Sequence, residues 1–353
     1  MSKRGAEAAS AGTSGTDAPD VYLAADSDHD GTEGSADDCI AEHPEMEARE
    51  RDNLLGECDL IMSFLMYNDI SKMSQFHRSA SAQMSRLAIS IRNEGGWTFG
   101  SPSVLMMFHR TPGELDKELA EMNDCMPHYY RITSGHGQGA ERIMNAEAEF
   151  LQGRFVDAQI CLENTYAHIA ENGQENMALC CDFLALRLAL CTELSLSYTI
   201  AERREKLMRR HNITWITLFD SACAYYYALS GQTDQIPALF REHKLSTVNF
   251  LAPGKPMMEL IENQVYLAQE ESAKVIGRSE RLLAVCETMH YALVALHIQI
   301  QTAAAYEKLG NARKPEHICD VPWMQHCRIS FTFLLWKLWV SGRTSGTGNA
   351  DCR

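Results

Sequence analysis

The sequence lacks the short motifs that mark most enzymes and metal sites. Its 353 residues contain no G-x-S-x-G nucleophile motif, no H-E-x-x-H zinc motif, no Walker A phosphate loop and no C-x-x-C pair. These absences disfavour an enzyme, and we expect no cofactor and no metal ion. Only ten prolines and few strand-like runs interrupt a chain that is 45% hydrophobic, which indicates a mainly helical protein with a sizeable core.

No hydrophobic run is long enough to span a bilayer. The longest, Ile329 to Val340, holds twelve residues including Lys337. The N-terminus does not read as a signal peptide, because Lys3 and Arg4 are followed by Gly, Ser, Ala and Asp rather than by an apolar segment. The twelve cysteines are scattered, most of them within apolar helical pattern, as expected of buried thiols in a reducing compartment. We therefore expect a cytoplasmic protein with no membrane partner.

Positive charge is also scarce. The chain carries 32 Lys or Arg against 47 Asp or Glu, a net charge of −15, which argues against general affinity for nucleic acid. Residues 1–41 are strongly acidic and poor in aromatic residues, so we expect a disordered acidic tail. Glu33 and the lack of a preceding apolar helix favour that tail over a calcium site, although part of a calcium-loop spacing is present at Asp26, Asp28, Asp30, Gly31 and Asp37.

A helical hairpin recurs along the chain at a spacing of 39 to 40 residues. Its clearest copy, AEAEFLQGRFVDA, has helical pattern on both sides of Gly153, and small Ala146 and Ala158 would let the two helices approach closely. This repeat predicts an all-α, tetratricopeptide-like right-handed superhelix of about six to seven hairpins over residues 42–311. An ordinary helical bundle is the alternative. The further turn marks are Gly113, Thr192 (a weaker one), Gly231, Glu270 and Gly310.

Two helices are expected before the repeat becomes regular. The first is Arg51–Tyr67, and the second is Ile70–Arg92, closed by the following glycine pair. A stop and a new start at residues 111–114 then predict a helix over Leu115–Tyr130. The apolar stripe of the first helix is Leu54, Leu55, Cys58, Ile61, Met62 and Leu65.

Three local patterns have a structural and a functional interpretation. The glycine-rich loop 134–139 could attract phosphate, but it lacks a Gly-Lys-Ser/Thr ending, so a flexible inter-helix turn is favoured. The basic segment ERREKLMRRH, residues 202–211, could contact nucleic acid, but its own glutamates favour a solvated helix face. Tyr225, Tyr226 and Tyr227 could stack on a ligand, and we expect Tyr227 to enter the core while the other two stay open.

Residues 42 to about 309 resemble the helical-repeat sensor region of the large, ATP-dependent LuxR-type transcription activators, a family that includes the activator of the maltose regulon. The resemblance implies an N-terminal NTPase, a tetratricopeptide-like superhelix that senses an inducer, and a C-terminal helix-turn-helix. The stretches that carry it are EHPEMEARERDNLLGECDL, FLMYNDISKMSQFHR, WTFGSPSVLMMFHRTPGELDKELAEM, AEFLQGRFVDAQICLE, NGQENMALCCDFLALRLAL and STVNFLAPGKPMMELIENQVYLAQ.

The chain departs from that plan at both ends. No Walker motif precedes residue 42, and an irregular tail with Pro315 and Pro322 stands at 312–353 in place of a helix-turn-helix. ATP hydrolysis and DNA binding therefore do not transfer, and DNA would be reached only through a domain absent here. We expect the tail to be frame-shifted or truncated relative to a longer parent from about residue 311.

The sequence thus predicts a signal-sensing module that binds an inducer or a protein partner in the groove of the superhelix. The alternative is a stand-alone tetratricopeptide-like scaffold for protein–protein interaction, and self-association stays open. In such a superhelix the first helix of each hairpin lines the concave groove. Counting back from the turn marks, the polar and aromatic candidates for the groove are Glu147, Asp182, Ser221, Tyr225, Gln264 and His297.

Overall fold

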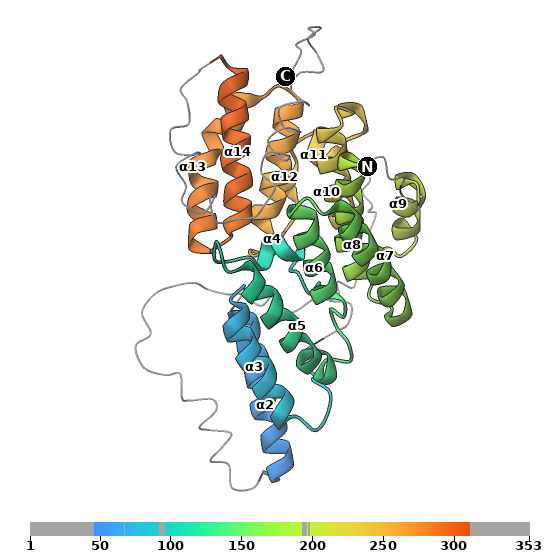
Figure 1. Cartoon of the computed structure of the whole chain (residues 1–353), viewed down its shortest axis with the longest axis vertical. Helices are drawn as coiled ribbons and strands as arrows, with labels where there is room; N and C mark the ends of the chain where they lie inside the picture. The colour runs from blue at the N-terminus through green and yellow to red at the C-terminus, as the bar shows by residue number, and fades with distance from the viewer. Residues whose placement is uncertain (1–45, 67, 92–95, 193–195, 197, 311–353) are drawn as a thin grey trace, which may run out of the picture. The chain divides into compact units, whose positions relative to one another are not determined.

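The structure is a computed structural model that describes residues 46–66, 68–91, 96–192, 196 and 198–310. In these residues it contains thirteen α-helices, two short 3-10 helices and no strand, which confirms the all-α prediction (Figure 1). The acidic segment 1–41 with its calcium-loop pattern, both expected domain boundaries and the tail 312–353 lie outside the described residues. The α-helices are α2 (Ala48–Leu65), α3 (Ile70–Gln83), α4 (Val104–Phe108), α5 (Leu115–Ile132), α6 (Ala140–Leu151), α7 (Phe155–Asn172), α8 (Glu175–Cys191), α9 (Ile200–Met208), α10 (Ile213–Leu229), α11 (Ala238–Arg241), α12 (Lys255–Ala268), α13 (Ser272–Thr288) and α14 (Ala292–Lys308), and the 3-10 helices are η1 (Thr233–Gln235) and η2 (Leu245–Thr247).

The turn marks found in the sequence lie at helix ends. Gly153 separates α6 from α7 with φ at 77°, a left-handed conformation that a glycine adopts without steric cost. Gly231 and Gly310 follow α10 and α14 with φ values of 75° and 68°. Glu270, between α12 and α13, also has a positive φ, 65°, although it carries a side chain. The spacing of the turns is thereby confirmed.

The α6–α7 hairpin packs as its small residues predict. Ala146 on α6 and Ala158 on α7 are both fully buried, and the two helices contact each other along their lengths. Because a methyl group takes so little room at a helix crossing, the two backbones can approach closely. This hairpin is therefore correctly placed by the sequence.

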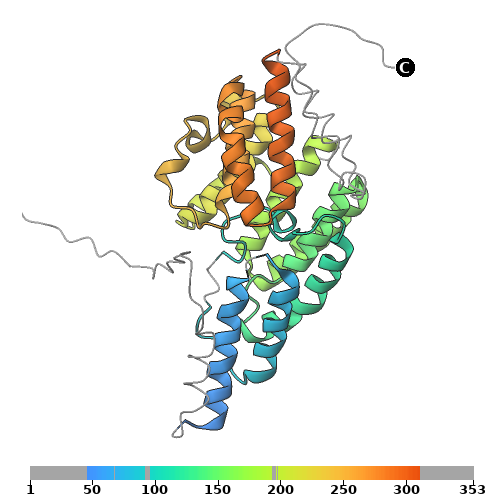
Figure 2. The ribbon, with the colours of Figure 1, turned by 90° about the vertical axis from the view of Figure 1, so that its left-hand side faces the viewer.

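Alternate helices form a row in which each member contacts the next. The row, called the inner row here, is α6, α8, α10, α12 and α14. The other long helices pack beside it: α7 contacts α6 and α8, and α13 contacts α12 and α14, as Figure 2 shows for α13 and α14. The short helix α4 contacts both α6 and α14, and all five of its residues are buried (Figure 1). The two ends of the inner row are therefore joined through α4.

The first two helices differ from their expected positions. Helix α2 begins three residues earlier than predicted, and its most buried face includes Asn53, Glu57 and Leu60 rather than the predicted apolar stripe. Ile61, a member of that stripe, is 50% exposed. Helix α3 ends at Gln83 rather than at residue 92, because side chains of α2 take the next amides: Asn53 accepts from Ser85, and Glu57 accepts from the backbone N–H of residue 89.

Among the described residues, no helix combines the length and the apolarity needed to cross a membrane. The most hydrophobic helices, including α10, are instead buried within the helical array. Five cysteines in these helices are buried and form no disulfide: Cys125, Cys180, Cys181, Cys223 and Cys286.

Candidate binding cleft

The six residues predicted to line a groove all lie on the inner row, and all are buried. None is more than 6% exposed. Glu147 belongs to α6 and Asp182 to α8, while Ser221 and Tyr225 lie on α10. The other two, Gln264 and His297, lie on α12 and α14. These positions therefore face protein in this structure, and their role as ligand contacts stays a prediction.

Three of the six surround a residue that the sequence analysis did not single out, Arg187 of α8. Its guanidinium nitrogen lies 3.3 Å from the Glu147 carboxylate, and its Cζ atom lies 4.4 Å from the centre of the Phe150 ring. Tyr225 reaches this cluster through Phe183, whose ring it meets edge to face at 5.5 Å. Burial, followed by the charge of Arg187, lowers the pKa of His297 to about 3, so this imidazole is neutral.

The segment before α4 completes the same cluster. The Ser103 hydroxyl donates to one Glu147 oxygen at 2.5 Å, and the backbone N–H of Leu105 donates to the other at 2.8 Å. Burial raises the pKa of Glu147, while Arg187 and these donors act against that rise. The inner face of the row is thus filled by the chain's own residues 103–108 at this point.

The remaining predicted residues lie elsewhere. Gln264 accepts a hydrogen bond from Gln301 at 3.2 Å, and the Ser221 hydroxyl donates to the backbone carbonyl of Leu218 at 2.6 Å. Asp182 points away from Arg187. It borders a cleft of about 770 Å³ that is lined by residues of α7, α8 and α9, by Tyr198 and Arg210, and by Trp215 at the start of α10.

A buried polar network forms one wall of this cleft. Arg203 of α9 donates to Asp182 at 2.8 Å and lies 2.7 Å from Glu175. The Tyr166 hydroxyl of α7 donates to the other Asp182 oxygen at 2.8 Å. Burial raises the pKa of Asp182, opposed by the Arg203 charge, and burial also holds the pKa of Tyr166 well above its usual value, so the phenol stays a donor. The network fixes α9 against α7 and α8.

The cleft shows that the basic segment was only partly understood. Its predicted solvated face is present, since Arg209 pairs with Glu205 at 2.6 Å across one turn of α9. Arg203 is instead buried, and Glu202 forms a capping box with Thr199 rather than an ion pair. The partners of Arg203 lie on α8, about twenty residues back, which local charge pattern does not reveal. The cluster of basic residues was the one available signal.

Two other expectations about polar and aromatic residues can be compared with the structure. Tyr225 is buried while Tyr226 and Tyr227 are half-buried, so the expectation that Tyr227 takes the core position is wrong. The glycine-rich loop joins α5 to α6 as an inter-helix turn, and its amides already have acceptors. Gly137 donates to Gln174, and Gly139 donates to the hydroxyl of Tyr130. These two donors are not available to a phosphate.

Two smaller cavities lie beside the segment 246–251. One, about 490 Å³, contains Glu259 and Glu262, which are paired with Arg281 at 2.8 Å and with Arg278 at 2.5 Å. The other, about 470 Å³, is lined without a charged residue. Across the part of the chain that the structure describes, no three His, Cys, Asp or Glu residues gather in a way that could hold a metal ion.

Comparison with known proteins adds no relative. No family model matches the chain, and neither a curated protein nor a solved structure matches it. The resemblance to LuxR-type regulators therefore stays a prediction from the sequence, and the cleft is interpreted from its own residues.

Proposed function

We propose that the described helices form a tetratricopeptide-like superhelix that serves as the ligand-sensing module of a LuxR-type transcriptional regulator, without ATPase or DNA-binding activity of its own. Three features support this proposal. Turns of positive φ recur at about 39 to 40 residues, the helices of the inner row contact one another in succession, and the sequence resembles the sensor region of these regulators.

The cleft between α7, α8 and α9 carries the functional part of the proposal. Its volume of about 770 Å³ lies within the range of small-molecule sites, which are about 300–1,000 Å³. Its lining combines apolar side chains such as Ile169 with the rings of Tyr166 and Trp215 and a few charged groups, the composition that such sites usually have. The inner face is a weaker candidate because residues 103–108 already fill part of it.

A variant that fills the cleft tests this proposal. Ala170 lines the cleft and is exposed, so Ala170→Trp should occupy it without disturbing the core. Ala167→Trp is the matched control, because Ala167 is an exposed residue of α7 outside the cleft. A small-molecule library would be screened by thermal shift and affinity mass spectrometry. We expect ligands that bind the wild type and Ala167→Trp and that Ala170→Trp no longer retains. The cleft is not a ligand site if Ala170→Trp retains every ligand.

A stand-alone interaction scaffold is the second candidate, favoured by an exposed apolar stripe beside the cleft. Val156 and Ile160 on α7 are 71% and 52% exposed and lie one turn apart. The two candidates differ in what the module is joined to. Reading the neighbouring coding DNA in all frames distinguishes them, since coding sequence for an NTPase and a helix-turn-helix supports the regulator and its absence supports the scaffold.

A further inference from the structure

We propose that the cleft selects a small amphipathic anion, with an apolar or aromatic body held by the cleft floor and an anionic head group held by Lys206 and Arg210. This inference rests on the proposed binding role of the cleft and adds the chemical class of the ligand. It comes from the charges that the fold leaves without a partner, compared with those that it pairs.

The basic segment supplies five cations, and the structure treats them unequally. Arg203 is held by Asp182 and Glu175, Arg204 makes two hydrogen bonds to Asp220, and Arg209 pairs with Glu205. The two cations left are Lys206 and Arg210. Both line the cleft, both are exposed, and within the described residues neither has an ion pair or a side-chain hydrogen bond.

The positions of these two cations suit a single head group. They are four residues apart, so their side chains leave neighbouring turns on the same side of α9 and the turn that follows it. A lysine ammonium and an arginine guanidinium can both donate to one carboxylate, sulfonate or phosphate. Such an anion would also relieve the repulsion between the two positive charges.

The carboxylates around the cleft are mostly committed within the protein. Glu175 and Asp182 are bound to Arg203, and both the backbone N–H and the hydroxyl of Thr199 donate to Glu202 in its helix cap. Glu163, on the α7 wall, accepts a hydrogen bond from Gln159 at 2.8 Å. The uncompensated cations therefore outnumber the one carboxylate that lacks a cationic partner or a helix cap, which favours an anionic ligand over a cationic one.

The floor of the cleft accounts for the apolar part of the ligand. Ile169, Ala170 and Ala178 supply aliphatic surface. The rings of Tyr166, Tyr198 and Trp215 supply flat surface against which an aromatic or aliphatic body can pack. A free inorganic anion would leave this surface exposed to water, so an amphipathic molecule fits better.

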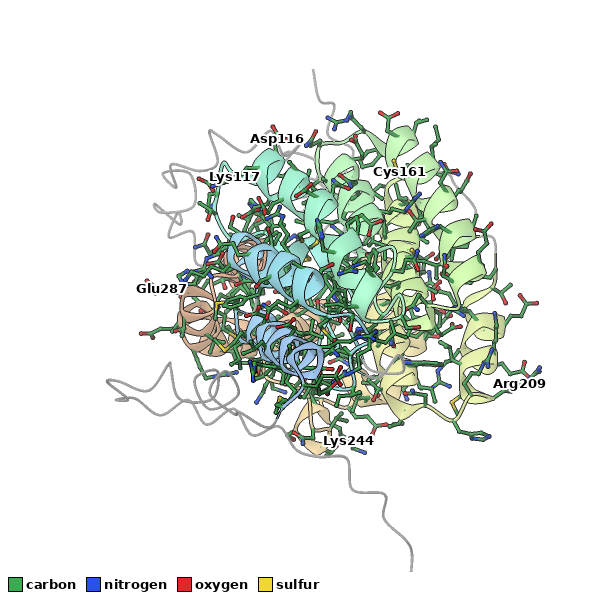
Figure 3. The ribbon with its side chains drawn as sticks, turned by 90° about the horizontal axis from the view of Figure 1, so that it is seen from below. Asp116, Lys117, Cys161, Arg209, Lys244 and Glu287 are labelled. Carbon is green, nitrogen blue, oxygen red and sulfur yellow. The ribbon has the colours of Figure 1, made fainter. Side chains whose placement is uncertain are left out.

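The test uses 1-anilinonaphthalene-8-sulfonate, an aromatic sulfonate whose fluorescence reports binding, with the full chain. Lys206→Glu/Arg210→Glu reverses both free cations and should weaken binding about tenfold. The matched control is Arg209→Glu/Lys244→Glu, which changes the net charge equally at two exposed residues that project away from the helices (Figure 3). Binding by this control should stay within about twofold of wild type.

A second arm separates the head group from the body. Indole-3-acetate, indole-3-ethanol and tryptamine share one ring system and differ in charge, and each would compete for the bound dye. We expect the anion to displace the dye at a concentration at least about tenfold lower than the cation needs, and acetate alone to have no effect.

The outcomes distinguish this inference from the proposed function. If tryptamine competes as well as indole-3-acetate, or the charge reversal leaves dye binding unchanged, the anionic selectivity is overturned while the cleft remains a ligand site. If Ala170→Trp also leaves dye binding unchanged, the dye does not occupy the cleft and both proposals fail.

Discussion

Single buried residues already give the protein a measurable dependence on pH. His77 on α3 is 1% exposed, its ring lies 4.8 Å from the ring of Tyr129, and neither ring nitrogen has a hydrogen-bond partner within the described residues. Burial, followed by the nearby His128 and Arg78, lowers the pKa of His77 to about 4. The folded protein therefore holds this imidazole neutral, whereas the unfolded chain would protonate it at about pH 6.5.

We expect acid to destabilise the fold through His77. Below about pH 6.5 the unfolded state binds more protons, so the free energy of unfolding falls with pH until the folded pKa near 4 is reached. At pH 4.5 the loss attributable to this histidine is about 2 kcal/mol. Urea unfolding of wild type and His77→Leu at pH 7 and pH 4.5 measures it, since the variant should lose less stability on acidification.

A histidine outside the core serves as the control for that experiment. His168→Gln changes a half-buried histidine of α7 and should leave the pH dependence as it is in wild type. His297 contributes acid sensitivity in the same direction in every variant, because its pKa is also lowered by burial. Equal pH dependence in wild type and His77→Leu would contradict the neutral state assigned to His77.

At the scale of helices, the α6–α7 hairpin should depend on its small residues. Ala158→Asp would place a carboxylate at a fully buried helix contact, and we expect a loss of about 3 kcal/mol or more. Val156→Asp on the same helix is the control: this position is 71% exposed and lies in the first turn of α7, where a negative charge is tolerated. Thermal melts followed by circular dichroism compare them. Similar melting temperatures for the two variants would show that the hairpin is misplaced.

The sequence predicted this element well because its signal is local. Gly153 marks a turn through its own conformational freedom, and Ala146 and Ala158 mark a close contact through their own size. The face of α2 was missed because it is partly polar: Glu57 is buried by donors that come from the segment after α3. Periodicity of apolar residues cannot detect a carboxylate whose partners are about thirty residues away.

The cleft was missed for a related reason. Asp182 was correctly singled out as an inward position of α8, but its partners Tyr166 and Arg203 come from two other helices. Lys206 and Arg210 differ from Arg209 only in which way α9 turns them, and that depends on how α9 packs on α10. Charge pattern identified the helix, whereas tertiary packing decides which of its cations remain free.

At the scale of the whole described array, Glu147 connects parts that are distant in sequence. It binds Arg187 of α8, and it accepts from Ser103 and Leu105 at the start of α4, which in turn contacts α14. Glu147→Leu would leave Arg187 as a buried charge with no carboxylate, at a cost of about 3–5 kcal/mol. Adding Arg187→Met should recover part of that loss, because the uncompensated charge is then removed as well.

The consequence for the array is that loosening α4 should be felt at α14. Hydrogen exchange of the Glu147→Leu/Arg187→Met variant, which removes both charges, should show reduced protection in α4 and in α14 relative to wild type. Helix α2 is the internal control, because its main contact is with α3. If exchange rose in α4 alone, the contact between α4 and α14 would not couple the ends of the inner row. If it rose in α14 as well, the carboxylate on α6 would be stabilising a helix about 150 residues further along the chain through a five-residue helix between them.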